Sequence, residues 1–214
     1  MRYFYNFFSK IPTFTINKWY NKIRKMEIAF MCQKEGQIRF PIKIDKLIQA
    51  VLWLLYHNNE TMDKIKLIKL FFLADRAHLA KYGRPIAGGN YYNMDHGPVL
   101  SQLKDILDYQ YDNQAGPFTL TKEHLIIAKE KPDDSTLSES DLKILDFIYR
   151  KYGHHPGWKL VDYTHKLQAY QDYEPSRGGR KDLPYEAFFL DLDQASQQML
   201  DLIRDHQESA GIIG

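Results

Sequence analysis

Residues 64–83 read KIKLIKLFFLADRAHLAKYG, and this stretch decides the fold. Its apolar side chains recur at helical spacing, but they extend most of the way around the helix instead of forming one stripe. Gly83 ends the pattern, as glycine often does at a helix C-terminus, and Thr61 is the expected N-cap residue on the other side. The sequence therefore predicts a central helix that packs against neighbours on several sides.

Helical periodicity continues on both sides of this segment. In IDKLIQAVLWLLYHN the apolar residues from Ile44 to Leu55 share one helical face. Ser138, with Asp141 three residues later, resembles a capping box for another helix, which Gly153 ends. Further helices are expected over residues 44–58, 98–110, 138–152, 158–168 and 192–206.

Two short segments have β character instead. PFTLT (117–121) and HLIIAKE (124–130) are partly β-branched and are separated by a tight link of two residues, so a small β-hairpin is predicted. EPSRGGRKDLP (174–184) is expected to be a loop because of its composition.

Length and composition suit one globular domain, or one domain with an appendage. The chain has 214 residues, of which 44% are hydrophobic and 26% are charged, as in an ordinary globular protein. The expected fold is mainly α: a compact multi-helix single domain over residues 38–208 with a small inserted β-hairpin. The tail at 209–214 is expected to fray.

Residues 1–37 are expected to form a separate basic and aromatic extension. Polar residues and Pro12 interrupt it too often for the core of a secretory signal. Three interpretations stay open: an interfacial segment, an arm that orders on a partner, or a misassigned start with translation beginning at Met26. In an arm, the expected anchors are aromatic: Tyr3, Phe4, Phe7, Phe8 and Trp19.

The net charge of +2 conceals an uneven distribution. Residues 1–26 hold six of the 29 basic residues and no acidic residue, which leaves 23 basic against 27 acidic residues in the rest of the chain. This body lacks the basic footprint of a protein that binds duplex nucleic acid. The single cysteine, Cys32, excludes an internal disulfide and agrees with a cytoplasmic location. The longest apolar run, AVLWLLY, is far shorter than the roughly 20 residues of a membrane span.

The sequence contains no recognisable catalytic motif. Neither a G-x-S-x-G nucleophile elbow nor a phosphate-binding G-x-x-x-x-G-K occurs. His154, His155, Asp162 and His165 lie close enough in sequence to suggest a metal site, but their spacing matches no zinc-ligand motif, so a solvated loop is favoured. We therefore expect no enzyme and no cofactor, with a metal-dependent hydrolase as the third alternative.

A winged helix-turn-helix is a second possibility. Two helices are joined by HNNET (57–61) and are followed later by a hairpin. The second helix, however, is apolar nearly all round, whereas a recognition helix needs a free polar face. Lys64, Lys66 and Lys69 are interpreted as the solvated edge of this helix. A DNA-binding regulator that represses its own operon is therefore the runner-up.

Four ordered blocks resemble the SocA-like antitoxin family, also described as the Panacea domain. They are KLIKLFFLADRAHLAKYGRPI, GGNYYNMDHGPVLSQL, LSESDLKILDFIYRKYG and WKLVDYTHK. The matching motif positions are Lys66 to Ala74, Tyr82-Gly83, Gly97-Pro98-Val99, Leu137 to Gly153 and Leu160 to His165. A tryptophan that the family often carries after the last block is replaced here by Tyr170 or Tyr173. The resemblance covers roughly residues 44–205, and the expected Panacea antitoxin domain spans residues 38–208.

The resemblance implies an antitoxin that neutralises a cognate, usually adjacently encoded, protein toxin by direct binding. Some relatives instead pass the toxin to an ATP-dependent protease. The family brings no catalytic residue and no cofactor. Nucleic acid is not an expected partner, except for autoregulation of the operon.

The turn NMDHGPVL (93–100) raises a question of its own. Gly97 permits a sharp turn, Pro98 is expected to start the next helix, and Asp95 with His96 either caps exposed amides or faces a partner. The expected structural motif residues are Gly83, Gly97, Pro98, Thr164 and His165. The candidate toxin-facing residues of this region are Tyr91, Tyr92, Asp95, His96 and Val99.

Overall fold

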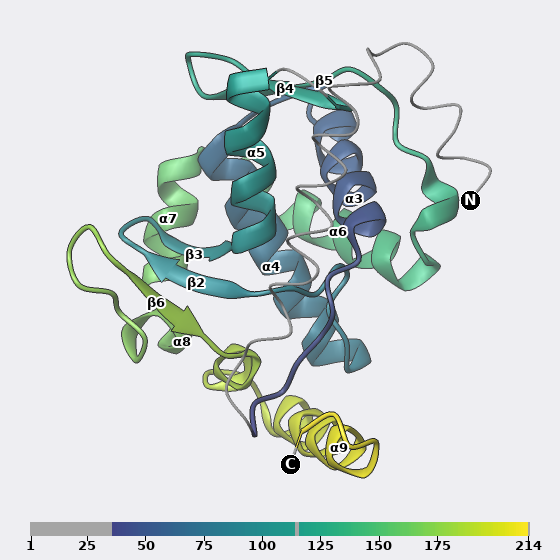
Figure 1. Ribbon diagram of the computed structural model, residues 1–214, viewed down its shortest axis with the longest axis vertical. Coiled ribbons are helices and arrows are strands. Elements are labelled where there is room, and N and C mark those ends of the chain that lie inside the picture. Colours follow the sequence, from purple (N-terminus) through teal and green to yellow (C-terminus); the bar gives the residue numbers. More distant parts are fainter. Residues whose placement is uncertain (1–35, 114–115, 214) are drawn as a thin grey trace.

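The computed structural model describes residues 36–113 and 116–213 (Figure 1). Within these ranges the fold is mainly α, as predicted, with seven α-helices labelled α3 to α9 and six short strands. The predicted aromatic anchors of the N-terminal extension lie outside the described residues: Tyr3, Phe4, Phe7, Phe8 and Trp19.

Helix α4 (Lys64–Tyr82) runs through the centre of the molecule. It contacts four other helices: α3 (Ile44–His57), α6 (Glu139–Tyr152), α7 (Gly157–His165) and α9 (Gln194–Ser209). Because these neighbours lie on different sides, buried residues occur around the whole helix. The predicted central helix is confirmed.

The two ends of α4 are fixed by local signals. Gly83 adopts the left-handed conformation at the C-terminus, with φ of 69°, as predicted. At the N-terminus the cap is Asp63, whose carboxylate accepts a hydrogen bond of 2.9 Å from the Lys66 amide. The prediction of Thr61 as the cap is wrong, because Thr61 is held in an extended conformation at the start of strand β1 (Thr61–Asp63).

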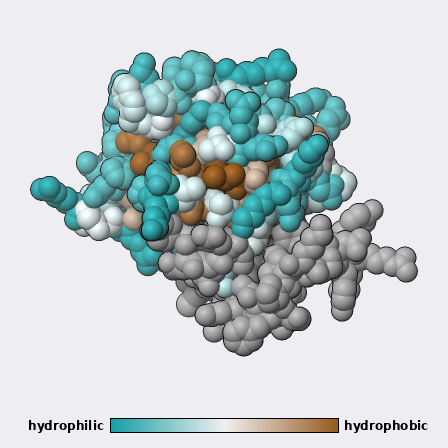
Figure 2. All heavy atoms as spheres, turned by 90° about the horizontal axis from the view of Figure 1, so that it is seen from above, coloured by the Kyte–Doolittle hydropathy of each residue, from teal (hydrophilic) through white to brown (hydrophobic). Residues whose placement is uncertain are grey.

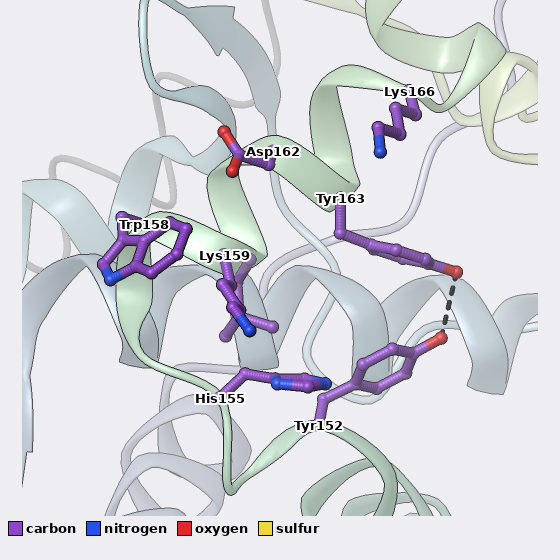
Figure 3. Close-up of a pocket in the computed structure, with 8 residues that line it drawn as sticks. Tyr152, His155, Trp158, Lys159, Asp162, Tyr163 and Lys166 are labelled. Carbon is purple, nitrogen blue, oxygen red and sulfur yellow. Dashed lines mark hydrogen bonds between the residues drawn. The ribbon is translucent and has the colours of Figure 1, made fainter.

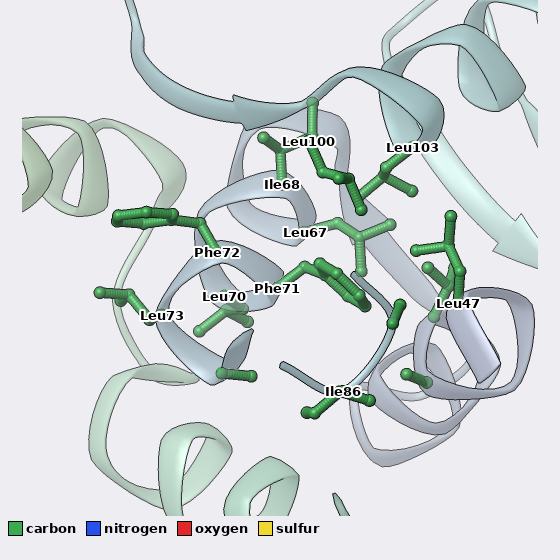
Figure 4. Packing of buried hydrophobic residues seen from close by; sticks show 14 of the residues in the cluster. Leu47, Leu67, Ile68, Leu70, Phe71, Phe72, Leu73, Ile86, Leu100 and Leu103 are labelled. Carbon is green, nitrogen blue, oxygen red and sulfur yellow. The ribbon is translucent and has the colours of Figure 1, made fainter. Parts of the chain in front are cut away.

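Side chains of α4 form the core on both sides of the helix (Figure 4). Leu67 and Phe71 point toward Leu47 of α3, whereas Phe72 points away from it. All four side chains are fully buried, and each such burial stabilises the fold by about 1.5–3 kcal/mol. This packing fixes the position of α4, and with it the positions of the polar side chains that α4 carries.

The first sheet has the strand order β1-β5-β4 and is antiparallel. Strands β4 (Phe118–Leu120) and β5 (Leu125–Ala128) form the predicted hairpin, which is confirmed. The pairing of Thr61 with Ile127 adds β1 to it. This third strand comes from a segment that the sequence analysis read as the start of a helix.

The second sheet has the order β3-β2-β6 and corrects two predictions. Residues Gly97–Leu100 form strand β3, which pairs with β2 (Tyr91–Met94), so helix α5 (Ser101–Asn113) begins after Pro98 and not at it. Pro98 is tolerated there because β3 is an edge strand. Residues Arg180–Leu183, expected to lie in a loop, form strand β6.

The C-terminal half is mostly helical. The predicted capping box is confirmed: the Ser138 hydroxyl accepts from the Asp141 amide, and the Asp141 carboxylate accepts from the Ser138 amide. The helix expected over 158–168 is divided into α7 and the short α8 (Gln168–Gln171). Two 3-10 helices complete the elements, η1 (Asp134–Thr136) and η2 (Tyr185–Phe189).

The C-terminal tail is tied to the body as far as the structure describes it. The amides of Ile212 and Ile213 donate to the Gln207 carbonyl, and Ile213 is buried against the core. This packing contrasts with the frayed tail expected over 209–214.

Hydrophilic side chains dominate the face shown in Figure 2, with a small group of hydrophobic atoms among them. No helix in the described ranges is both long and apolar enough to cross a membrane.

Candidate functional site

Three segments that are distant in sequence meet beneath the β2–β3 hairpin. The Lys69 ammonium on α4 donates a hydrogen bond of 2.8 Å to the Pro98 carbonyl on β3. A β-carbon placed on Gly97 would lie 2.8 Å from the Thr164 hydroxyl oxygen, 3.2 Å from the Lys69 ammonium and 3.3 Å from the His165 ring. The structure therefore brings together four of the five predicted motif residues with one lysine. We call these the Lys69 cluster: Lys69, Gly97, Pro98, Thr164 and His165.

Lys69 is a buried cation and not part of a solvated edge, which corrects its interpretation from the sequence. Its exposed fraction is 2%, whereas Lys64 and Lys66 are half-buried. Burial lowers the pKa of the Lys69 ammonium from 10.5 to about 7, because the charged form is poorly solvated in the interior. Close to neutral pH, Lys69 is therefore balanced between its charged and neutral forms.

His165 closes the cluster from α7. Its ring stacks on Tyr170, with centroids 4.1 Å apart and planes 11° from parallel. Tyr170, one of the two tyrosines expected in place of the family's tryptophan, therefore packs against the Thr-His pair. Burial, reinforced by Lys69, lowers the pKa of His165. The Nε2 atom of His165 is buried and has no hydrogen-bond partner among the described residues.

The hairpin turn exposes only part of the predicted toxin-facing set. Asp95 and His96 are exposed, and Tyr92 is half-buried with the Arg180 guanidinium 4.8 Å from its ring centroid. Tyr91 and Val99 are buried, with exposed fractions of 3% and 4%. This corrects the placement of these two side chains on a partner-facing surface.

Asp95 does cap an exposed amide, but not one of the next helix. Both of its carboxylate oxygens lie 3.0 Å from the Gly178 amide, which donates to them. Gly178 precedes strand β6, so the contact links the β2–β3 turn to a segment about eighty residues away. His96, next to Asp95, points from the same turn without a comparable contact within the described ranges.

Tyr91 belongs to a second buried network that the sequence analysis missed. Its hydroxyl donates to Asp75 at 2.9 Å, and the Ile86 and Ala87 amides donate to the other carboxylate oxygen at 2.8 and 3.3 Å. Burial raises the pKa of Asp75 to about 7 despite these hydrogen bonds. An acid inside the apolar run LFFLADRA was the available signal.

Asp141 is the centre of a third polar group, which joins α3, α4 and α6. Its carboxylate forms salt bridges with Lys46 and Arg84 and lies 3.0 Å from the Nε2 atom of His78. Burial alone would raise the pKa of Asp141, but hydrogen bonds from His78 and Lys46 hold it well below its usual range. Because each contact comes from a different element of the scaffold, a structural role accounts for this group.

The histidine pair gives no metal centre in the residues that the structure describes. His154 and His155 lie with ring centroids 3.9 Å apart, and His165 belongs to the Lys69 cluster. No group of three or more histidine, cysteine, aspartate or glutamate residues within 36–113 and 116–213 is arranged to hold a metal ion.

The winged helix-turn-helix interpretation also fails on geometry. Helix α4, the predicted recognition helix, has buried side chains all around its axis between Leu67 and Arg76. Such a helix has no free polar face to enter a DNA groove.

The outer face of α7 lines a shallow hollow of about 280 Å³ between α6 and α7 (Figure 3). That volume is just below the range of roughly 300–1,000 Å³ typical of small-molecule sites. We call it the α6–α7 groove. Its lining residues are Tyr152, His155, Trp158, Lys159, Leu160, Asp162, Tyr163 and Lys166.

Fold and cluster together define a compact helical domain in which one buried lysine joins a β-hairpin to a helix that ends in a Thr-His pair. Residues 67–171 match the family model described as antitoxin SocA-like, Panacea domain. The matched region is similar to this family over about half of the chain; it extends from α4 to α8 and contains the whole Lys69 cluster. No curated protein and no solved structure matched the chain.

Proposed function

We propose that this protein is an antitoxin that neutralises a cognate protein toxin by direct binding, acting in the cytoplasm and without catalysis. The match of residues 67–171 to the SocA-like antitoxin family carries the proposal. The presence of the Lys69 cluster supports it, because the same motif positions define the resemblance and here form one packed unit.

The exposed part of the β2–β3 turn is one proposed contact surface for the toxin. Asp95 and His96 project from it, with the half-buried Tyr92 beside them. The turn is held from below by Lys69 and from the side by Gly178. A surface that is fixed before binding loses little conformational entropy when a partner docks. The N-terminal extension is proposed as a second, variable contact.

Growth of cells that express the adjacent open reading frame, with and without this protein, tests the proposal. Toxicity relieved by co-expression, together with co-purification of the two proteins, is the expected result. A neighbour that is harmless, or a toxicity that this protein does not relieve, contradicts it. Following the amount of toxin after synthesis is stopped separates simple sequestration from delivery to an ATP-dependent protease, since only delivery lowers the toxin level.

The regulator alternative has its own measurement. A gel shift with the upstream DNA at increasing salt distinguishes specific binding from general attraction to phosphates, which disappears by about 0.2 M salt. Binding that persists above this concentration, with no effect on toxicity, would replace the antitoxin proposal.

A further inference from the structure

The α6–α7 groove combines exposed aromatic rings with unpaired cations. The exposed fraction of Trp158, which lines the groove, is 61%, and that of Phe147 on α6, whose ring lies near Lys151, is 52%. The Tyr152 and Tyr163 hydroxyls are joined by a hydrogen bond of 2.9 Å at the floor (Figure 3). Exposed large aromatic side chains of this kind are enriched where proteins bind each other.

Two cations of this face, Lys151 and Lys159, lie over aromatic rings. The Lys159 ammonium lies 5.5 Å from the Trp158 ring centroid, and the Lys151 ammonium lies 5.1 Å from that of Tyr152. Neither these lysines nor Lys166 forms an ion pair within the described part of the chain. By contrast, Lys143 and Arg150 on α6 are paired with acids of their own helix.

Little negative charge opposes these lysines. Asp162 is the one acid among the lining residues in the described structure, and Figure 3 shows its carboxylate directed away from the Tyr152–Tyr163 pair. Burial, then the neighbouring His154 and Lys159, lowers the pKa of His155, which also lines the groove. Two lysines, Lys159 and Lys166, therefore line the hollow against one acid, Asp162, and a third lysine, Lys151, lies beside its Tyr152 ring.

The groove is also fixed in place. Gly157, at the start of α7, lies so close to the N-terminus of α4 that a β-carbon on it would be 2.7 Å from the Asp63 carboxylate. This contact locks the first turn of α7, which carries Trp158 and Lys159, to the central helix. A preformed surface with one sign of charge selects partners of the opposite sign.

We propose that the α6–α7 groove docks an acidic segment of a partner protein. Carboxylates of that segment pair with Lys151, Lys159 and Lys166, and one apolar side chain packs against Trp158. The small hollow suits a single side chain, and three cations around it are too few for the backbone of a nucleic acid, whose binding sites usually follow many phosphates. This docking proposal does not depend on the antitoxin role. The further identification of the docked partner as the toxin rests on the proposed function.

Binding of a fluorescent synthetic peptide to the full chain tests this proposal. The peptide carries glutamates on both sides of one phenylalanine, and a matched peptide carries glutamine in place of every glutamate. We expect the acidic peptide to raise the fluorescence anisotropy saturably and the glutamine peptide to bind more weakly. Affinity should fall as salt is raised above about 0.15 M, because exposed charges are screened.

Two variants locate the binding, and each has a matched control. Trp158→Ala should weaken the acidic peptide by at least about tenfold, as loss of a central aromatic anchor does. Leu202→Ala, at a side chain of similar exposure (62%) on α9, should have no effect. Lys159→Glu combined with Lys166→Glu should weaken binding by at least about fivefold, whereas Lys122→Glu on the β4–β5 link should not.

Three results would overturn the proposal. One is equal affinity of the protein for the two peptides, or equal affinity of the groove variants and their control variants for the acidic peptide. Another is tighter binding of a single-stranded oligonucleotide that depends on the same lysines, which would assign the groove to nucleic acid. The third is self-association that Trp158→Ala abolishes, which would assign it to a second copy of this chain. Toxin neutralisation that survives the groove variants rejects the groove as toxin contact while leaving the antitoxin proposal intact.

Discussion

The Lys69 ammonium on α4 donates to the backbone carbonyl of Pro98 on β3, across 2.8 Å of the protein interior. This bond joins the central helix to the hairpin whose turn carries Asp95 and His96. Thr164 and His165 on α7 fill the same space, at the position where a β-carbon on residue 97 would lie. The motif residues of the Panacea family thus act here as one packing unit that sets the position of an exposed turn.

The buried Lys69 ammonium should leave a signature in the pH dependence of stability. Its pKa is about 7 in the folded chain and 10.5 ordinarily. Between these values the unfolded chain binds more protons, so the free energy of unfolding rises with pH, by up to about 1.4 kcal/mol per pH unit. Lys69→Met should flatten this rise in urea titrations between about pH 7 and 9.5. Lys122→Met, at the surface, should leave the slope unchanged, and parallel curves for wild type and Lys69→Met would refute the assignment.

Asp75 should make the free energy of unfolding fall as pH rises, over a lower pH range than that of Lys69. Burial raises its pKa from 3.8 to about 7, so the folded chain holds the extra proton and the stabilisation from this group is lost as pH rises from about 4 to 7. Asp75→Asn keeps an oxygen for the Ile86 and Ala87 amides, and its amide group can donate to the Tyr91 hydroxyl. The variant should therefore gain stability relative to wild type as pH increases across this window. Denaturant titrations at about pH 4.5, 5.5 and 6.5, set about one unit apart to follow a single titration, measure the difference, and a constant difference would contradict the prediction.

Gly97 should tolerate a side chain much less well than Gly178. Both have positive φ, 89° and 73°, so alanine costs roughly 1–2 kcal/mol of backbone strain at either position. Only at Gly97 would the new methyl group also meet Thr164, 2.8 Å away, whereas nothing lies within 4 Å at Gly178. Gly97→Ala should cost about 1–3 kcal/mol more than Gly178→Ala. Equal losses in melting temperature would show that the cluster beneath the hairpin is loosely packed.

Local signals in the sequence predicted the elements that local interactions determine. The apolar pattern of α4, the left-handed Gly83 and the capping box of Ser138 with Asp141 all act within a few residues and are confirmed. The N-cap of α4, predicted as Thr61, depends instead on a contact that is distant in sequence. Asp63 caps α4 because strand pairing with β5, more than sixty residues later, holds Thr61 extended.

The second sheet and the Lys69 cluster depend on contacts that no local pattern encodes. Tyr91 pairs with Leu183 across more than ninety residues, and strands of four residues give little periodicity. Pro98 suits either a helix start or an edge strand, so its identity alone did not separate them. Lysine is almost never fully buried, which is why Lys69 was assigned to the surface. The family resemblance grouped the motif residues, but only the fold shows that they touch.

Substitutions of His96 and Asp95 should distinguish a role in partner contact from a role in supporting the turn. His96 is exposed, and substitution of such a surface residue usually changes stability by no more than about 0.5 kcal/mol. His96→Ala should therefore leave the melting temperature nearly unchanged and weaken neutralisation of the toxin in the growth assay. Asp95→Ala also removes the acceptor of the Gly178 amide, so it should lower both the melting temperature and neutralisation. His206→Ala, at an exposed histidine on α9, controls for loss of an imidazole. Full neutralisation by His96→Ala, or a loss of folding that matches its loss of function, would show that His96 only supports the turn.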